Sequence, residues 1–302
     1  MLASGEKLMY EVLPADAGRR IRQLLASRLG LSRALIQRLR ENNRVKLNEQ
    51  AVYLTQFAQA GDLISVDLVF DETSAIVPEA MDLNVIFEDA DFLVLNKPPG
   101  ILVHPVGVHN SGTLANGVMY RWQQQGIASK FRPIHRIDRY TSGVVVVGKN
   151  QFAHQALYKQ LSEHCVDRVY LGLVQEHLTP LKGTIDAPIA RDPKSIIARC
   201  VADTGQSAIT HYEVIRTYQD ISLLKLRLTT GRTHQIRVHL SYIGHPLLGD
   251  TLYGGTVSHL KRQALHSFKF GFVHPRTKQK VCFTAPLPPD LLQIIRGQSV
   301  TN

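Results

Sequence analysis

Apolar residues recur with the rhythm of β-strands in several parts of the chain. Residues 61–70, GDLISVDLVF, alternate apolar and polar side chains, which is typical of a strand with one face buried. Residues 144–147 are four consecutive valines, which favours a strand that is buried on both faces. Further strands are predicted at residues 44–52, at 167–176 and 221–230, and on either side of a turn within 85–105.

Other segments have the spacing of helices. Ile21, Leu24, Leu25 and Leu29 fall on one helical face, and Ser32 is placed to cap a second helix that carries Leu35, Ile36 and Leu39. Longer helical stretches are predicted near residues 111–125 and 150–162. A further helix is predicted with Thr233 as its cap, Ile236, Leu240 and Ile243 on its apolar face, and Gly244 at its end.

These elements predict two domains. The first 72 residues combine two short helices with a few strands, residues 73–85 have the composition of a linker, and residues 86–302 form a larger domain. In that larger domain strands and helices do not alternate strictly. We therefore predict an α+β fold with a mixed, largely antiparallel sheet, rather than a doubly wound parallel sheet.

The charge distribution indicates a polyanionic partner. Lysine and arginine number 35 against 25 acidic residues, which gives a net charge of +10. A basic excess of this size favours a nucleic acid or an anionic membrane surface as partner. Residues 17–46 hold nine cations and one acid, so this segment carries 9 − 1 = +8. Most charge runs form a solvated face, but such faces usually interleave glutamates. We therefore favour phosphate contacts.

Several classes of protein do not fit the sequence. There is no run of 18 apolar residues to span a membrane, and the first residues do not resemble a signal peptide. Three cysteines far apart, with no CxxC, indicate free thiols in a reducing cytoplasm. His234 and His239 are five residues apart, about 140° around a helix, so one metal cannot bind both. We expect no metal and no cofactor.

A lone carboxylate stands among cations at residues 131–149, FRPIHRIDRYTSGVVVVGK. Asp138 precedes the valine strand in a predicted loop, and Arg136 and Arg139 flank it and are expected to keep it ionised. An ionised carboxylate is available as a nucleophile or base. On charge alone, a structural Asp–Arg pair that holds a turn is the better interpretation. Arg237, in a helix's first turns, is a second candidate because its guanidinium can clamp a carboxylate.

Longer motifs favour the catalytic interpretation. HRIDRYTSG at 135–143 resembles the catalytic signature of the RluA family of pseudouridine synthases. Other matches occur in the family's order: NKPPGILVHP (96–105), RVY (168–170), GRTHQIRVHL (231–240), GHPLLGD (244–250), RQALHS (262–267) and FTAPLP (283–288). Residues 18–48 with GDLISV at 61–66 resemble an S4-like RNA-binding domain, with Asn43 where glycine is usual. Ile137 and Tyr140 replace a leucine and an acidic residue, respectively.

The resemblance implies roles for individual residues. The reaction detaches uracil from ribose in RNA and rejoins it through carbon, with Asp138 as the catalytic aspartate. Arg237 pairs with Asp138, Arg136 fills the vacated base stack, and Tyr170 stacks on the extruded base. Without the resemblance Tyr170 reads as an ordinary strand aromatic, and Lys97 either contacts phosphate or serves the turn that follows it. The remaining candidates for RNA contact are arginines: Arg19, Arg20, Arg33, Arg38, Arg139 and Arg232.

Two alternatives were weighed against this hypothesis. A non-catalytic RNA-binding protein would not need Asp138 or Arg237, and both residues are present. A metal-dependent or nucleophilic hydrolase is disfavoured because the chain has no G-x-S-x-G or H-E-x-x-H. Ribosomal RNA of the large subunit is favoured over transfer RNA as the substrate, by analogy with relatives that carry an S4-like domain. A cytoplasmic monomer is expected. The covalent step that Asp138 performs stays open.

Overall fold

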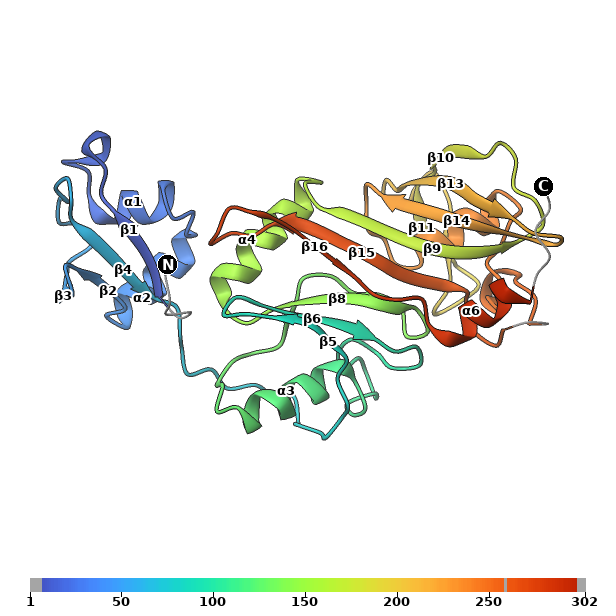
Figure 1. Cartoon of the computed structure of the whole chain (residues 1–302), viewed down its shortest axis with the longest axis horizontal. Helices are drawn as coiled ribbons and strands as arrows, with labels where there is room; N and C mark the ends of the chain where they lie inside the picture. The colour runs from blue at the N-terminus through green and yellow to red at the C-terminus, as the bar shows by residue number, and fades with distance from the viewer. Residues whose placement is uncertain (1–6, 258–259, 298–302) are drawn as a thin grey trace.

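The computed structural model describes residues 7–257 and 260–297, in which an extended segment joins two large sheets (Figure 1). The first sheet belongs to residues 7–67, here called the arm, and has the strand order β1-β4-β2-β3. The elements of the arm are β1 (Lys7–Glu11), the 3-10 helix η1 (Pro14–Asp16), α1 (Ile21–Ser27), α2 (Arg33–Glu41), β2 (Val45–Leu47), β3 (Gln50–Ala51) and β4 (Leu63–Asp67).

The arm folds as its sequence pattern predicts. The Ser32 hydroxyl accepts a hydrogen bond from the backbone N–H of Leu35, which caps α2 as expected. Leu24, Leu25 and Leu35 are fully buried between the helices and the sheet. Asn43, which follows α2, has φ 51° and therefore adopts the left-handed backbone that asparagine tolerates.

The second sheet has ten strands and is mixed. Its order is β10-β13-β14-β9-β15-β8-β6-β5, with β16 paired to β15 and β7 paired to β8. All of these pairs are antiparallel except β15 with β8. The strands are β5 (Val85–Glu88), β6 (Phe92–Lys97), β7 (Arg132–Pro133), β8 (Ser142–Gly148), β9 (Asp167–Gln175), β10 (Lys182–Asp186), β13 (Ile209–Thr217), β14 (Ile221–Leu228), β15 (Leu265–Val273) and β16 (Lys280–Thr284). The predicted α+β class is confirmed.

Helices cover both faces of this sheet at its β8 side. In β8, Val145 and Val147 face the side packed by α3 (Leu114–Gln124), while Val144 and Val146 face α4 (Gln151–Ser162). This two-sided burial explains why the strand is a continuous apolar run. The remaining elements are the hairpin β11 (Ile189–Arg191) and β12 (Arg199–Val201), α5 (Gln235–Tyr242), the 3-10 helix η2 (Thr251–Tyr253) and α6 (Pro289–Arg296). Among the residues that the structure describes, no helix is long and apolar enough to cross a membrane.

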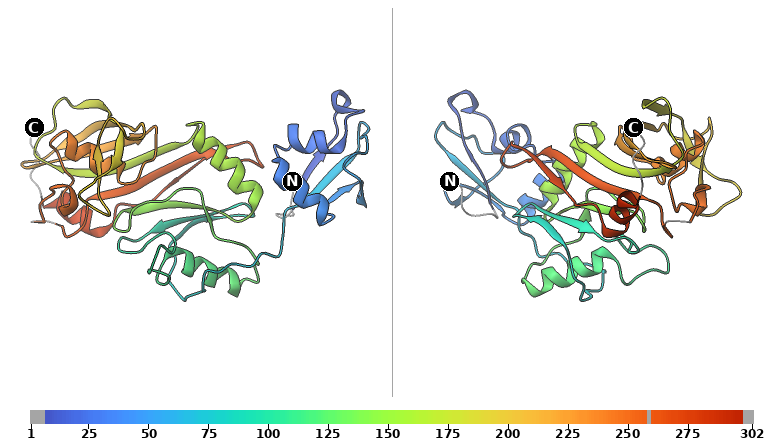
Figure 2. Two further views of the ribbon diagram at one scale, coloured as in Figure 1. Left: turned by 180° about the vertical axis from the view of Figure 1, so that it is seen from behind. Right: turned by 45° about the vertical axis from the view of Figure 1, so that its right-hand side comes forward.

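Residues 68–84 form neither helix nor strand and connect the two sheets. The arm lies beyond α4, at one end of the large sheet, in all three views (Figures 1 and 2). Phe152, from α4, is buried within the apolar core of the arm. Arg38 of α2 donates to Glu72 (2.7 Å) and to the side chain of Gln151 (3.0 Å). The arm is therefore packed against the larger domain through both apolar and ionic contacts.

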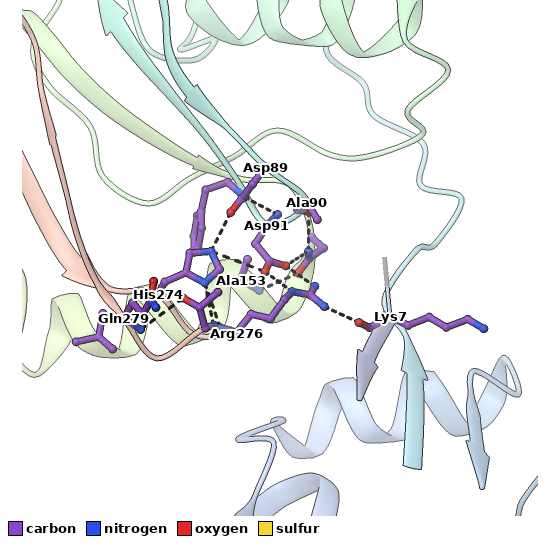
Figure 3. Close-up of polar contacts among 12 residues, drawn as sticks. Lys7, Asp89, Ala90, Asp91, Ala153, His274, Arg276 and Gln279 are labelled. Carbon is purple, nitrogen blue, oxygen red and sulfur yellow. Dashed lines mark hydrogen bonds and ion pairs between the residues drawn. The ribbon is translucent and has the colours of Figure 1, made fainter. Parts of the chain in front are cut away.

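A second polar contact joins the two units (Figure 3). Arg276 follows β15 and binds Asp91 with two hydrogen bonds of 2.7 and 2.8 Å, and it also donates to the carbonyl oxygen of Lys7 in β1. Asp91 is almost fully buried, so this guanidinium neutralises a buried charge and reaches the arm at the same time.

Candidate active site

Asp138 begins a short segment, residues 138–142, whose last residue is the first of β8; we call this segment the Asp138 loop. The turn into the strand depends on Gly143, which has φ 111° and lies against β15. A Cβ atom at this position would be 2.2 Å from the carbonyl oxygen of Ser267, closer than any side chain can approach. The glycine of the sequence motif is therefore required by a left-handed backbone and by close packing.

Each residue that follows Asp138 in the loop is held by a group from another part of the fold. Lys97 donates to the Arg139 carbonyl oxygen (3.0 Å), and Arg262 donates to that of Tyr140 (3.1 Å). The Gln263 amide donates to the Thr141 hydroxyl at 3.3 Å. The Ser142 hydroxyl is 2.9 Å from Nδ1 of His266, whose Nε2 donates to the Ala285 carbonyl. The loop is thus a rigid support for Asp138, of the kind that precise catalytic geometry needs.

The cation that contacts Asp138 is Arg237, which is 99 residues away in the sequence. Its Nη1 donates to Oδ2 of Asp138 at 3.1 Å, while Nε and Nη2 bind the two oxygens of Asp250 at 2.7 and 2.8 Å. Among the described residues, neither Arg136 nor Arg139 forms a hydrogen bond or ion pair with Asp138. Arg136 is exposed, and Arg139 donates its Nε–H to the Gly100 carbonyl oxygen at 2.8 Å.

Arg237 is itself fixed and permanently charged. Burial lowers the pKa of its guanidinium, but the carboxylates of Asp250 and Asp138 outweigh that effect and raise the pKa above its usual value. The side chain of Asp250 is only 2% exposed, whereas that of Asp138 is 25% exposed. Asp250 therefore serves as the buried anchor of Arg237, and Asp138 is the carboxylate that a substrate can reach. The sequence reasoning did not single out Asp250, although it lies within the quoted motif GHPLLGD.

The helix that carries Arg237 begins later than predicted. It starts at Gln235, after His234, and Thr233 does not cap it. Instead the Gln235 side chain accepts from the backbone N–H of Arg232 and from the Thr230 hydroxyl. His234 adopts a left-handed backbone with φ 59°, and its imidazole Nε2 lies 4.0 Å from Oδ1 of Asp138. The predicted cap was wrong because the left-handed turn at His234 redirects the chain before the helix begins.

His239 does not belong to this site. It is fully buried, and its Nε2 donates to the Ala187 carbonyl while Nδ1 is 2.9 Å from the Thr210 hydroxyl. In the described parts of the chain, no group of three or more metal-binding side chains is brought together.

Tyr170 is in β9, and β15 lies between this strand and β8. Its side chain belongs to the apolar core that also contains Ile137, Leu226 and Ile236, and the residue is only 6% exposed. Burial raises the pKa of its hydroxyl, so the ring is neutral at physiological pH. Because the ring is packed among core residues and is almost fully buried, stacking on a base requires local movement. The stacking role stays a prediction.

Lys97 cannot contact phosphate in this structure. It is fully buried, and its ammonium group donates to the carbonyl oxygens of Pro98, Ile101 and Arg139 at 2.8–3.0 Å. Burial, with a smaller contribution from Arg262, lowers the pKa of Lys97 to about 7, and Asp138 opposes this shift. The three carbonyls favour the charged form. Of the two interpretations of this lysine, the one in which it serves the turn is the one the geometry supports.

The predicted RNA-binding arginines fall into two groups. Arg19 and Arg38 are committed to internal ion pairs: Arg19 and Arg28 share the fully buried Asp16, and Arg38 binds Glu72. The Arg28 guanidinium, with Tyr10 and Arg19, holds the pKa of the Asp16 carboxyl well below its usual range, against the effect of burial. Arg33, Arg136 and Arg232 are exposed, and Arg20 is half-buried beside the Phe57 ring.

The comparisons with known proteins agree with this geometry. The family model described as RNA pseudouridylate synthase matches residues 91–242, half of the chain, and this range includes Asp138, Tyr170 and Arg237. A Bacillus subtilis protein named uncharacterized RNA pseudouridine synthase YjbO is 40% identical over 276 residues, which cover 91% of this chain and 98% of that protein. The ribosomal large subunit pseudouridine synthase D of Pasteurella multocida is 33% identical over 96% of this chain and 94% of its own.

Among solved structures, human RNA Pseudouridylate Synthase Domain Containing 1 superposes with a TM-score of 0.58 at 26% identity. The match covers 76% of this chain and all of the human chain. This chain belongs to the RNA pseudouridylate synthase family. It is an isomerase that converts uridine in RNA to pseudouridine.

Proposed function

We propose that this protein isomerises a uridine of large-subunit ribosomal RNA and that Asp138 is the catalytic carboxylate. The observation that carries the catalytic assignment is the asymmetry around Asp138. Arg237 holds one oxygen, Oδ2, at 3.1 Å, while the side chain stays 25% exposed and the loop beneath it is anchored at every residue. A fixed and accessible carboxylate is what a reaction at a glycosidic bond requires.

The chemistry follows from what such a carboxylate can do. In glycosidases a carboxylate stabilises or captures the sugar cation that develops as a glycosidic bond breaks. Asp138 is placed for an analogous part while uracil is detached and turned. Whether its oxygen attacks the sugar, attacks the base or removes a sugar proton is left open by this proposal.

The reacting nucleotide has to leave the helical stack first, because its glycosidic bond is not accessible within a duplex. Arg136 is exposed and two residues from Asp138, so we assign it the space that the extruded base leaves. Tyr170 is assigned the opposite task of stacking on the extruded base, since aromatic side chains commonly hold splayed bases in this way.

Ribosomal RNA is proposed as the substrate because several relatives are named ribosomal large subunit pseudouridine synthase D, from Pasteurella multocida and Zymomonas mobilis among others. The basic arm, which resembles an S4-like RNA-binding domain, supports this choice. We further propose that the protein acts as a monomer in the cytoplasm, where ribosomal RNA is modified.

Two measurements test the proposal. Total RNA from a strain that lacks the protein is mapped for missing pseudouridines, and loss only from transfer RNA would contradict the ribosomal substrate. The same RNA is then treated with purified Asp138→Asn, which we expect to form no pseudouridine while binding RNA normally. Asp220→Asn, which changes an exposed carboxylate in the turn between β13 and β14, serves as the matched control with full activity. Normal turnover by Asp138→Asn would refute the catalytic assignment.

A further inference from the structure

His234 occupies a strained position beside the site. It is a residue other than glycine with φ 59°, and it immediately precedes α5. A left-handed backbone is unfavourable for a residue that carries a side chain, and such outliers persist where the surroundings enforce them. This backbone conformation places the imidazole between Tyr253 and Asp138. It therefore invites the question of what this ring does there.

Two contacts fix the ring. Nδ1 of His234 is 2.8 Å from the Tyr253 hydroxyl, and the two rings meet edge to face with centroids 5.7 Å apart. The same hydroxyl accepts a hydrogen bond of 2.9 Å from the backbone N–H of Arg199, at the start of β12. The Tyr253 ring also lies under the Arg237 guanidinium, at 4.9 Å. Tyr253 thus contacts both His234 and the arginine that holds Asp138.

These contacts allow the tautomer of the imidazole that carries its proton on Nε2. The Tyr253 oxygen accepts from Arg199, and its own hydrogen can be donated to Nδ1 of His234. The ring proton is then on Nε2, which faces Oδ1 of Asp138 at 4.0 Å. Burial lowers the pKa of His234, Asp138 and Asp250 oppose this, and Arg237 and Arg199 reinforce it. The ring is therefore neutral near pH 7, with a single outward donor.

We propose that His234, oriented by Tyr253, is a positioning residue that holds the second oxygen of Asp138 when RNA is bound. The separation of 4.0 Å is too long for a hydrogen bond, so a shift of about 1 Å on substrate binding would complete it. Arg237 would then fix Oδ2 and His234 would fix Oδ1. Each carboxylate oxygen has a second lone pair, so Oδ1 would still be able to react. This inference rests on the proposed catalytic role of Asp138.

The substitutions at His234 separate the effect of the backbone conformation from the effect of the side chain. Asn also tolerates the left-handed conformation, but its amide ends near the position of Nδ1 and does not reach Asp138. Gln extends further and places an N–H donor near the position of Nε2. Tyr253→Phe keeps the ring under Arg237 and removes only the hydroxyl. The measurements are the single-turnover rate at saturating enzyme and the enzyme concentration at half-maximal rate, on total RNA from a strain that lacks the protein.

We expect His234→Asn to slow the saturated rate about 10- to 100-fold, which is the usual effect of losing a hydrogen bond to a charged group. The half-saturating enzyme concentration should stay unchanged. His234→Gln should restore part of that loss. Tyr253→Phe should slow the reaction of the native enzyme about tenfold but have no further effect in the His234→Asn background, because both changes remove the same oriented donor.

Several results would overturn the inference. A normal saturated rate for folded His234→Asn would exclude the positioning role, and so would equal rates for the Asn and Gln variants. If Tyr253→Phe slows both backgrounds equally, Tyr253 acts through Arg237 and not through His234. If His234→Asn does not fold, the rate of the Tyr253→Phe variant tests the inference by itself. An unchanged rate for that variant would refute the positioning role. Activity of Asp138→Asn would refute the proposed function itself, which a normal His234→Asn enzyme would not.

Discussion

Arg237 is expected to be as important for stability as for catalysis, and the structure allows the two contributions to be separated. Its guanidinium has two hydrogen bonds to Asp250, which is only 2% exposed, and a single longer one to Asp138. Arg237→Met keeps the aliphatic stem of the side chain but leaves Asp250 as a buried carboxylate without its cation. Removal of one partner of a buried ion pair typically costs about 3–5 kcal/mol. We expect the free energy of unfolding to fall by that amount.

The double variant Arg237→Met with Asp250→Asn removes both charges. Replacement of a whole buried ion pair is often close to neutral, so we expect at least about 2 kcal/mol of the lost stability to return. Catalysis should not return, because Asp138 still lacks the donor at Oδ2. The loss of one such electrostatic partner in an active site typically slows turnover about 10²- to 10³-fold.

Urea unfolding of the native, single and double variants measures stability, with equal slopes required before midpoints are compared. Pseudouridine formation under single-turnover conditions measures catalysis for the folded fraction. The reasoning is refuted if the double variant is as unstable as the single one, since Asp250 would then not be the uncompensated charge. It is also refuted if the double variant recovers activity, since Arg237 would then matter only for folding.

Two further predictions concern cations outside the Asp138–Arg237 pair. Lys97→Met should lower the free energy of unfolding by about 1–3 kcal/mol and slow turnover, because it leaves buried carbonyls without a donor. An altered salt dependence of RNA binding in this variant would contradict the burial of Lys97. On the arm, Arg22, Arg33 and Arg40 are exposed and form no ion pair within the described residues. Their joint replacement by Gln should flatten the log–log salt slope of RNA binding by about two. Lys182→Gln in β10 is the control, and equal slopes for the two variants would mean that the arm carries only a solvated face.

Much of the fold was predictable because its signals are local. The alternation in residues 61–70 places Ile64 and Val66 correctly on a buried face of β4, although Ser65 between them is buried as well. The valine run at 144–147 correctly predicts that both faces of β8 are buried, and Ser32 marks the start of α2. These patterns depend on a few neighbouring residues, so they can be recognised without knowledge of the rest of the chain. The motif around Asp138, read through its resemblance to a family, pointed to the correct class of enzyme.

The resemblance to the family implied the Arg237–Asp138 pair, but the partners of the other cations were decided only by the tertiary structure. Spacing along the chain alone favoured Arg136 and Arg139 as partners of Asp138. It gave no indication that Asp250 and Tyr253 hold Arg237 in turn. Lys97 looked accessible and is buried beneath the Asp138 loop. The physical reason is that the energy of a charge depends on its burial and on the groups within a few ångströms. Those quantities are set by which strands and helices meet in space, and spacing along the chain does not specify them.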